Sequence, residues 1–448
     1  MKDLQAIVDQ VVAQANADEQ LEAVAISSSS TDVRVYEGEI ESFSSADTHG
    51  VGIRVIKDGR TGFAWAGALD ETIISETLAD ARDNASFAES DEFAGLAEPD
   101  GLAPTASDRL LRTDLVAVDT QRKIDLAVEL ERVIRAADPR ISAVESCDYG
   151  DEIGSSAIAT TTGVRGTESA SASYVSAYTL ASDGTDTQTG FGFSVGRHPD
   201  DLDIEAAAAD AVGRATRMLG AVKPASERVT VVLDPFVTAQ FLAVIASTLG
   251  GESVMKGRSL FADRVGEQVA AGIVTFVDEP TNPDAFTASA LDGEGLATRR
   301  NAFIDGGVLT GFAHNAYTGR ALGTASNGCA VRGGFKSRPG AGCAAVSLVP
   351  GTADQAELLS QVGDGVLVQS VSGLHSGVNP VSGDFSTGAE GLRIRGGAAA
   401  EPLREFTIAS TILRMLSDVS AVGGDLEWLP MSAAGVSLVI GDVTVSGA

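Results

Sequence analysis

The chain has 448 residues, of which 44% are hydrophobic and 21% charged; this excludes a globally disordered protein and favours two domains over one core. Its formal net charge of −30 argues against nucleic acid as a partner, because phosphate binding relies on Lys and Arg that release counterions. The three cysteines, Cys147, Cys329 and Cys343, show no CxxC spacing and are typical of a reducing cytoplasm.

The first segment of the chain predicts an amphipathic helix, because apolar residues recur at helical spacing from Leu4 to Ala17. It lacks the charged-then-apolar order of a secretion signal. An uncharged apolar run long enough for a membrane helix is not found in the sequence. We therefore expect a cytoplasmic protein that does not enter a membrane.

Short alternating segments come next and predict strands over residues 24–28, 31–37, 39–45, 50–57 and 60–66. Glu37-Gly38 and Asp58-Gly59 separate neighbouring segments, and Asp-Gly is a favoured two-residue hairpin turn. Strands joined this tightly pair antiparallel. A helix over residues 72–88 follows, with acidic residues before its first turn.

The same kind of pattern recurs further along. A helix over residues 118–137 ends at Asp138-Pro139, strands occupy 141–195, and a helix covers 201–219. We interpret residues 1–222 as an N-terminal α+β domain of antiparallel sheets with helices, made of two sub-halves at about 1–100 and 110–222. The polar residues 223–227 mark the predicted domain boundary.

Residues 228–448 form the predicted C-terminal domain. A strand over 228–234 opens it, and many short strands bounded by glycine follow. Helices are expected only at 236–249, 352–361 and 408–419. This composition indicates a β-rich, barrel-like or sandwich domain with few helices, so the predicted fold class of the whole chain is α+β.

Four stretches carry a resemblance to a known family. They are residues 35–42 (VYEGEIES), 256–267 (KGRSLFADRVGE), 377–391 (GVNPVSGDFSTGAEG) and 419–427 (VSAVGGDLE). In this order they resemble the TldD/PmbA family of metalloprotease-related proteins. The resemblance implies two paired types of subunit: one carries an HExxxH helix and a C-terminal cysteine that bind zinc, and the PmbA or TldE type lacks these ligands.

The resemblance places the metal helix within residues 235–249. Aligned on Lys256-Gly257-Arg258-Ser259, the HExxxH positions fall on Leu242, Ala243 and Ser247, which cannot hold zinc or act as a general base. Residues 426–448 contain no cysteine. The chain is therefore predicted to be of the PmbA/TldE type, with no catalytic residue and no metal of its own.

The remaining candidate residues concern binding. Lys256 and Arg258 either pair with carboxylates across a domain or subunit contact or lie in a solvated turn. Asn379 and Asp384 lie in a glycine-rich segment that permits tight turns and close approach of backbone to a peptide. His314 is a further candidate; with His375 and either Asp384 or Glu390 it would form an alternative metal site on separate segments.

Three functional hypotheses remain open at this point. The first is a metal-free subunit that pairs with a TldD-type, zinc-bearing sibling and helps it to cleave unfolded peptides. The second is a homodimeric peptide-binding or scaffold protein without protease activity. The third is a cryptic metallopeptidase that uses His314 or His375. In the first two, an extended peptide is held by backbone pairing at a sheet edge.

Overall fold

A six-stranded antiparallel sheet forms the N-terminal part of the protein, in a computed structural model that describes residues 3–105 and 107–447. Its strand order is β3-β2-β1-β4-β5-β6. β1 pairs with β4 from Glu22 to Val35, so the two predicted sub-halves share one continuous sheet. The strands are β1 (Gln20–Tyr36), β2 (Glu39–Lys57), β3 (Arg60–Ala66), β4 (Ile141–Thr160), β5 (Arg165–Ser182) and β6 (Thr187–Gly196).

The long strands differ from the short ones that the sequence predicts. Residues 24–28 and 31–37 belong to one strand, β1, and residues 39–45 and 50–57 to another, β2. The run from Ser27 to Ser30 does not break β1, because each of these residues pairs with β2 on one side and β4 on the other. The predicted hairpin turn at Asp58-Gly59 is confirmed: both residues have positive φ, 52° and 74°.

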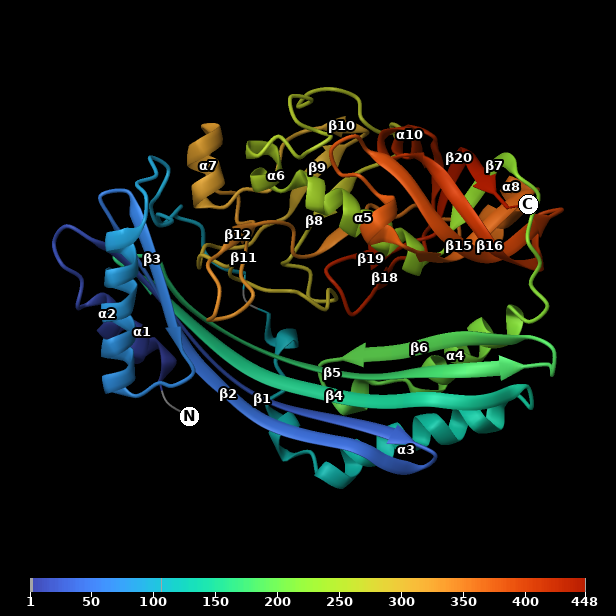
Figure 1. The fold of residues 1–448 in the computed structure, drawn as a ribbon, viewed down its shortest axis with the longest axis horizontal. Helices are drawn as coiled ribbons and strands as arrows, with labels where there is room; N and C mark the ends of the chain where they lie inside the picture. Colours follow the sequence, from blue (N-terminus) through green and yellow to red (C-terminus); the bar gives the residue numbers. More distant parts are fainter. Residues whose placement is uncertain (1–2, 106, 448) are drawn as a thin grey trace.

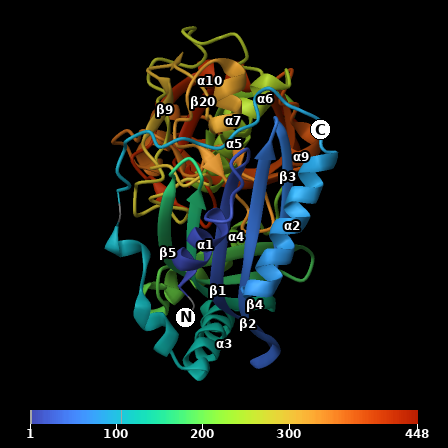
Figure 2. The same cartoon turned by 90° about the vertical axis from the view of Figure 1, so that its left-hand side faces the viewer.

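Four helices cover one face of this sheet, and the C-terminal domain covers the other (Figure 1). α1 (Leu4–Val12) and α2 (Glu71–Phe87) pack on one end of the sheet. α3 (Thr120–Ala137) and α4 (Ile204–Arg217) pack on the other. Figure 2 shows the C-terminal domain stacked above the sheet from the side of α1 and α2.

The C-terminal domain contains a five-stranded barrel, which confirms the barrel-like expectation. Strands β16-β15-β14-β7-β20 are hydrogen-bonded in this order, and β16 pairs with β20 to close the ring. β7 and β14 are parallel, and the other pairs are antiparallel. The strands are β7 (Glu227–Leu233), β14 (Gly365–Ser372), β15 (Asp384–Arg395), β16 (Ala398–Thr411) and β20 (Leu438–Ser446), with β17 (Val419–Val422) added on β20.

Short elements complete this domain. The predicted helix over residues 408–419 is wrong at its start: residues up to Thr411 belong to β16, where Ile408 pairs with Thr387 and with Val445. The other elements are β8 (Phe276–Asp278), β9 (Asn301–Asp305), β10 (Val308–Leu309), β11 (Ala330–Val331), β12 (Gly340–Ala341), β13 (Val346–Leu348), β18 (Glu427–Trp428), β19 (Ala434–Gly435), α6 (Gly251–Met255), α7 (Ala316–Leu322), α8 (Gln355–Val362), α9 (Leu374–Gly377) and α10 (Ile412–Ser417).

The helix α5 (Pro235–Leu249) lies at the centre of the largest hydrophobic cluster. Asp234 caps its N-terminus, since the side chain accepts a hydrogen bond from the Phe236 N–H, and Pro235 occupies the first turn. Phe241 meets Phe385 of β15 edge-on, with ring centroids 5.7 Å apart. None of the helices in the described ranges is long and apolar enough to cross a membrane.

Candidate functional site

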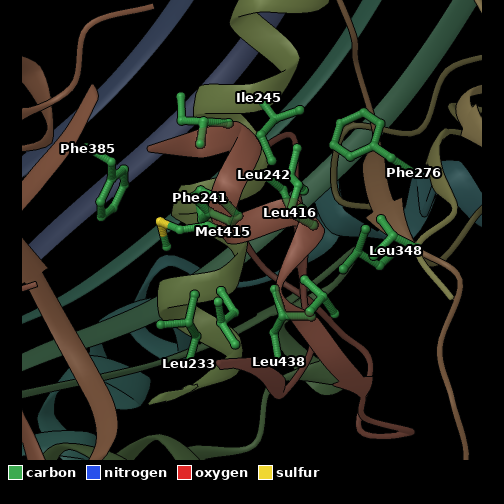
Figure 3. Close-up of a cluster of buried hydrophobic side chains, with 14 of the residues drawn as sticks. Leu233, Phe241, Leu242, Ile245, Phe276, Leu348, Phe385, Met415, Leu416 and Leu438 are labelled. Carbon is green, nitrogen blue, oxygen red and sulfur yellow. The ribbon is translucent and has the colours of Figure 1, made fainter. Parts of the chain in front are cut away.

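The three positions of the predicted metal helix lie on α5 in different surroundings. Leu242 is 0% exposed, and Figure 3 shows it among the side chains of Leu416 and Phe276. Ala243 is half-buried, and Ser247 is exposed with its hydroxyl donating to the Val244 carbonyl at 2.7 Å. These side chains present a hydrocarbon, a methyl group and a locally bonded hydroxyl, so their chemistry does not suit zinc.

One stripe of α5 is not covered by the core. Phe236, Gln240, Ala243 and Ser247 follow one another at helical spacing, and all four are partly or fully exposed. Phe236 and Gln240 line a cavity between α5 and the N-terminal sheet. The helix on which the three predicted metal positions lie therefore contributes to the space between the two domains.

This space is a groove made of three adjoining cavities, which share lining residues. Their volumes are about 570, 310 and 410 Å³. The first and second share Phe286, and the second and third share Ile26, Ser156, Glu168 and Thr287. One wall is the face of β1, β4 and β5 that is turned away from the helices, and the other is the segment around residues 286–291.

Two charged side chains of the groove, Glu168 and Arg197, hydrogen-bond to the opposite wall. Glu168 on β5 accepts hydrogen bonds from the Ser289 hydroxyl at 2.7 Å and the Ala290 N–H at 2.5 Å. Arg197 donates to the carbonyls of Ser171 and Ala285. These contacts tie the segment around residues 286–291 to the sheet, and the lining of the groove is more apolar than polar.

A buried ionic network joins the two domains beside the groove. Arg54 on β2 donates to Glu22 on β1 at 2.6 Å, and Arg332 of the C-terminal domain donates to the other oxygen of Glu22 at 2.7 Å. Arg54 Nη2 lies 3.8 Å from Oε1 of Glu294, whose Oε2 accepts the Ala316 N–H. All four charged side chains are less than a tenth exposed.

The pKa values of the two carboxylates in this network are shifted in opposite directions. Burial alone would raise the pKa of Glu22, but Arg332 and Arg54 together hold it below its usual value. Burial raises the pKa of Glu294 to about 7, which Arg54 offsets only in part. The sequence analysis missed this network. The sequence feature that could have revealed it is a charged residue inside an otherwise apolar strand segment, as in LEAVA for Glu22 and GIRVI for Arg54.

A separate cavity of about 580 Å³ lies at the other end of the domain contact. Lys256, which directly follows α6, lines it and pairs with Glu252 of α6 at 2.8 Å, so its ammonium group is already held by the neighbouring helix. Arg258 is exposed and forms no ion pair within residues 3–105 and 107–447. Of the two predicted interface cations, Arg258 is the one that is left available to a partner.

The glycine-rich segment lies against the turn after α6. The Leu260 N–H donates to the Pro380 carbonyl at 3.1 Å. Asn379 is exposed, and its side chain accepts from the N–H groups of Val381 and Ser382. The exposed Asp384 accepts from the Ser382 hydroxyl at 2.6 Å. Tertiary structure thus brings two of the four family stretches together, with Asn379 and Asp384 both shaping a turn.

The two histidines of the alternative metal site differ in their exposure to solvent. His314 is buried beside α7, its Nδ1 lies 3.3 Å from Thr318 Oγ1, and burial lowers its pKa. His375 is exposed on α9. Burial raises the pKa of the Cys329 and Cys343 thiols well above the usual value. In the described part of the chain, no group of three or more His, Cys, Asp or Glu side chains is arranged to hold a metal ion.

Comparison with protein families matches three models along the chain. Residues 21–86 match PmbA/TldA metallopeptidase domain 1, residues 113–219 match the central domain and residues 226–447 match the C-terminal domain. The metalloprotease PmbA of Escherichia coli O157:H7 is 27% identical over 391 residues, covering 87% of this chain and 84% of that protein. The PmbA homologue of Haemophilus influenzae is 25% identical and covers 98% and 94%.

Solved structures share the fold over nearly the whole chain. A Thermotoga maritima protein described as a putative modulator of a DNA gyrase superposes with a TM-score of 0.90 at 23% identity, covering 98% of this chain and 99% of that one. TldE from Thermococcus kodakarensis superposes with a TM-score of 0.89 at 22% identity and covers 100% of both chains. The protein is thus a member of the TldD/PmbA family of metalloprotease-related proteins.

Proposed function

We propose that this protein is the metal-free subunit of a hetero-oligomeric peptidase, in which a TldD-type sibling with an HExxxH helix supplies zinc and cleaves unfolded peptides. The observation that carries the proposal is α5. The metal positions are a core leucine, an alanine and a serine, yet the helix still borders the groove between the domains. The chain therefore keeps a space for a peptide without the ligands for zinc.

A free sheet edge supports pairing with another chain. Residues 39–49 of β2 pair with β1 on one side, whereas β3 pairs only with residues from Val51 onwards. All of residues 39–49 are exposed, including Ile40 and Phe43. Proteins normally cover or blunt an edge of this length, because its unpaired backbone groups attract other strands.

The dimensions of the groove support an extended substrate. Its three cavities lie in sequence between the sheet and the segment around residues 286–291, and their lining is more apolar than polar. A folded domain does not enter cavities of a few hundred Å³ each, whereas an unfolded chain does. The proposal includes an unfolded peptide as the substrate, zinc bound by the sibling subunit and a cytoplasmic location.

Coexpression with an HExxxH-type family member tests the proposal. We expect one shared peak in size-exclusion chromatography, zinc in the complex by mass spectrometry, and chelator-sensitive cleavage of an unstructured peptide by the complex alone. Separate peaks for the two proteins would contradict pairing and favour the homodimeric peptide-binding alternative. Zinc bound by this chain alone would favour the cryptic metallopeptidase, and His314→Ala and His375→Ala would then identify the ligand.

The Phe43→Lys variant tests the role of the β2 edge. Phe43 is 46% exposed, so its replacement does not disturb the core, but it places a cation on the edge strand beside the side chains of any added strand. We expect weaker complex formation with this variant. Ile273→Lys, at a position 53% exposed in the C-terminal domain, is the matched control.

A further inference from the structure

The first cavity of the groove is unusually rich in aromatic side chains. Only 5% of the chain is aromatic, yet six aromatic residues line this one cavity of about 570 Å³, together with Gln240 and Pro430. They come from β5 and β6, from α5 and from the segment that forms the opposite wall. The six are Tyr174, Tyr178, Phe191, Phe193, Phe236 and Phe286; we call this cavity the aromatic pocket.

The rings are held in a fixed arrangement across the domain contact. Phe191 of β6 contacts Phe236 of α5 with ring centroids 4.7 Å apart, and Tyr178 lies 6.2 Å from Phe191. Tyr178 is nevertheless 52% exposed. The pocket is therefore a preformed, open surface and not a closed part of the core, because a packed aromatic core would cover its rings.

Charge around the aromatic pocket discriminates between ligands. Arg214 lies over the Phe191 ring at 4.7 Å and over the Phe236 ring at 5.8 Å, and Arg197 lies over Phe286 at 5.9 Å. The electron-rich faces of these rings are thus already engaged by guanidinium groups. Arg214 is itself paired with Asp210 at 3.3 Å, so like charge is not what excludes a cation. A Lys or Arg side chain in the pocket would find these ring faces already occupied and would lose its hydration against a mostly apolar lining, whereas an uncharged ring would not.

One polar atom of a residue that lines the pocket lacks a hydrogen-bond partner among the described residues. The Oε1 atom of Gln240 is buried and has no hydrogen-bond partner among the described residues. An unpaired buried amide oxygen is costly, and when the half-buried Gln240 side chain turns towards the pocket, a ligand N–H or O–H group removes that cost. Tryptophan and tyrosine combine a flat apolar ring with such a donor.

We propose that the aromatic pocket is a specificity site for a Trp or Tyr side chain of an extended peptide. This inference rests on the proposed function, in that the groove receives a peptide, and it adds which residue the groove selects. The aromatic pocket lies at one end of the groove, so a ring held there would lead the following residues along β5 towards the second and third cavities.

Fluorescence anisotropy with three labelled, unstructured peptides tests the site on the full chain. The peptides are identical except for one central residue, which is Trp, Ala or Lys. We expect the Trp peptide to bind about tenfold or more tightly than the Ala peptide, the order of magnitude for burying one large ring. The Lys peptide should bind no more tightly than the Ala peptide.

Two variants alter the aromatic pocket in different ways. Ser176→Trp fills the cavity and leaves its aromatic wall in place, and Tyr178→Ala removes an exposed ring. Both should lose most of the preference for Trp. Tyr36→Ala, at an exposed position of the β1–β2 hairpin, is the control and should keep it. Urea unfolding of each variant establishes that it is folded.

Three results would overturn the specificity site: equal binding of the Trp and Ala peptides to the wild type, a preference that survives in Ser176→Trp, or no binding of either peptide. Equal binding would still agree with a peptide-binding subunit. Pairing with the sibling is measured separately by size-exclusion chromatography. Failure of the specificity site is therefore distinguishable from failure of the proposed function.

Discussion

Arg332 of the C-terminal domain reaches Glu22 of the N-terminal sheet, and its Nη2 donates to Glu22 Oε1 across 2.7 Å. Both side chains are buried, at 6% and 2% exposure. Arg332 also donates to the carbonyls of Gly293 and Ser337 in its own domain. One guanidinium group therefore fixes the loops beside the groove to the sheet that forms the opposite wall.

Removal of this guanidinium should strongly destabilise the protein. Arg332→Ala leaves Glu22 with Arg54 as its remaining cation in a buried site, and breaking a buried ion pair costs on the order of 3–5 kcal/mol. Urea denaturation measures the free energy of unfolding. The control is Arg165→Ala, which breaks an exposed pair with Asp9 and should cost less than about 1 kcal/mol. Similar losses in both variants would contradict the role of Arg332.

Glu294 should make the stability depend on pH. Its pKa is raised from 4.5 to about 7, so the folded protein binds more protons than the unfolded chain. The stability that this proton confers is fully present below about pH 4.5 and is lost as the pH rises through 7. Glu294→Gln should therefore gain stability relative to the wild type across this interval, by roughly 3 kcal/mol in total.

Thermal unfolding of both proteins between pH 5 and 8 measures this difference. Glu41→Gln, an exposed substitution in β2 with the same change of charge, corrects for the lower overall repulsion of an acidic protein. A constant difference between Glu294→Gln and the wild type over the whole interval would contradict the prediction.

Rebuilding the HExxxH residues on α5 should destabilise the protein because of position 242, and the cysteine ligand implied by the resemblance would still be missing from residues 426–448. Leu242→His places an imidazole in a site of 0% exposure surrounded by hydrocarbon, with an expected cost of about 2–5 kcal/mol. Ser247→His, at an exposed position, should cost less than about 1 kcal/mol. Urea denaturation and metal analysis of the single variants and of the combination with Ala243→Glu check this. Stoichiometric zinc in the triple variant would show that the core rearranges.

Two glycines around α4 should respond in opposite ways to replacement by alanine. A Cβ at Gly213, within the helix, would meet only the flexible end of Arg217 at 3.2 Å, so Gly213→Ala should stabilise by about 0.5–1 kcal/mol. A Cβ at Gly192 of β6 would lie 2.0 Å from the Ala207 carbonyl of α4. Gly192→Ala should destabilise by about 1–3 kcal/mol, measured by urea denaturation of both variants. Equal effects of the two would be inconsistent with this packing.

Local chemistry made several elements predictable. α5 begins where Asp234 and Pro235 stand in the sequence, and the β2–β3 hairpin turns at Asp58-Gly59. These features depend on a few adjacent residues, namely a capping carboxylate, a proline ring or a glycine with positive φ. The helices at 71–87 and 235–249 accordingly lie within a residue of their predicted bounds.

The sequence by itself determined the α+β class, the Asp58-Gly59 turn, the starts of α1, α2 and α5 to within a residue, and the absence of zinc-ligand residue types at positions 242, 243 and 247. Only the tertiary structure decided that Ser27 to Ser30 continue a strand, that β16 closes a barrel on β20, and that six aromatic residues surround one cavity. The physical reason is the distance along the chain between the residues that interact. Caps and turns act between neighbours in the chain. Strand partners and buried ion pairs join residues that are distant in the sequence and meet only in the folded protein; Glu22 and Arg332, for example, are 310 residues apart.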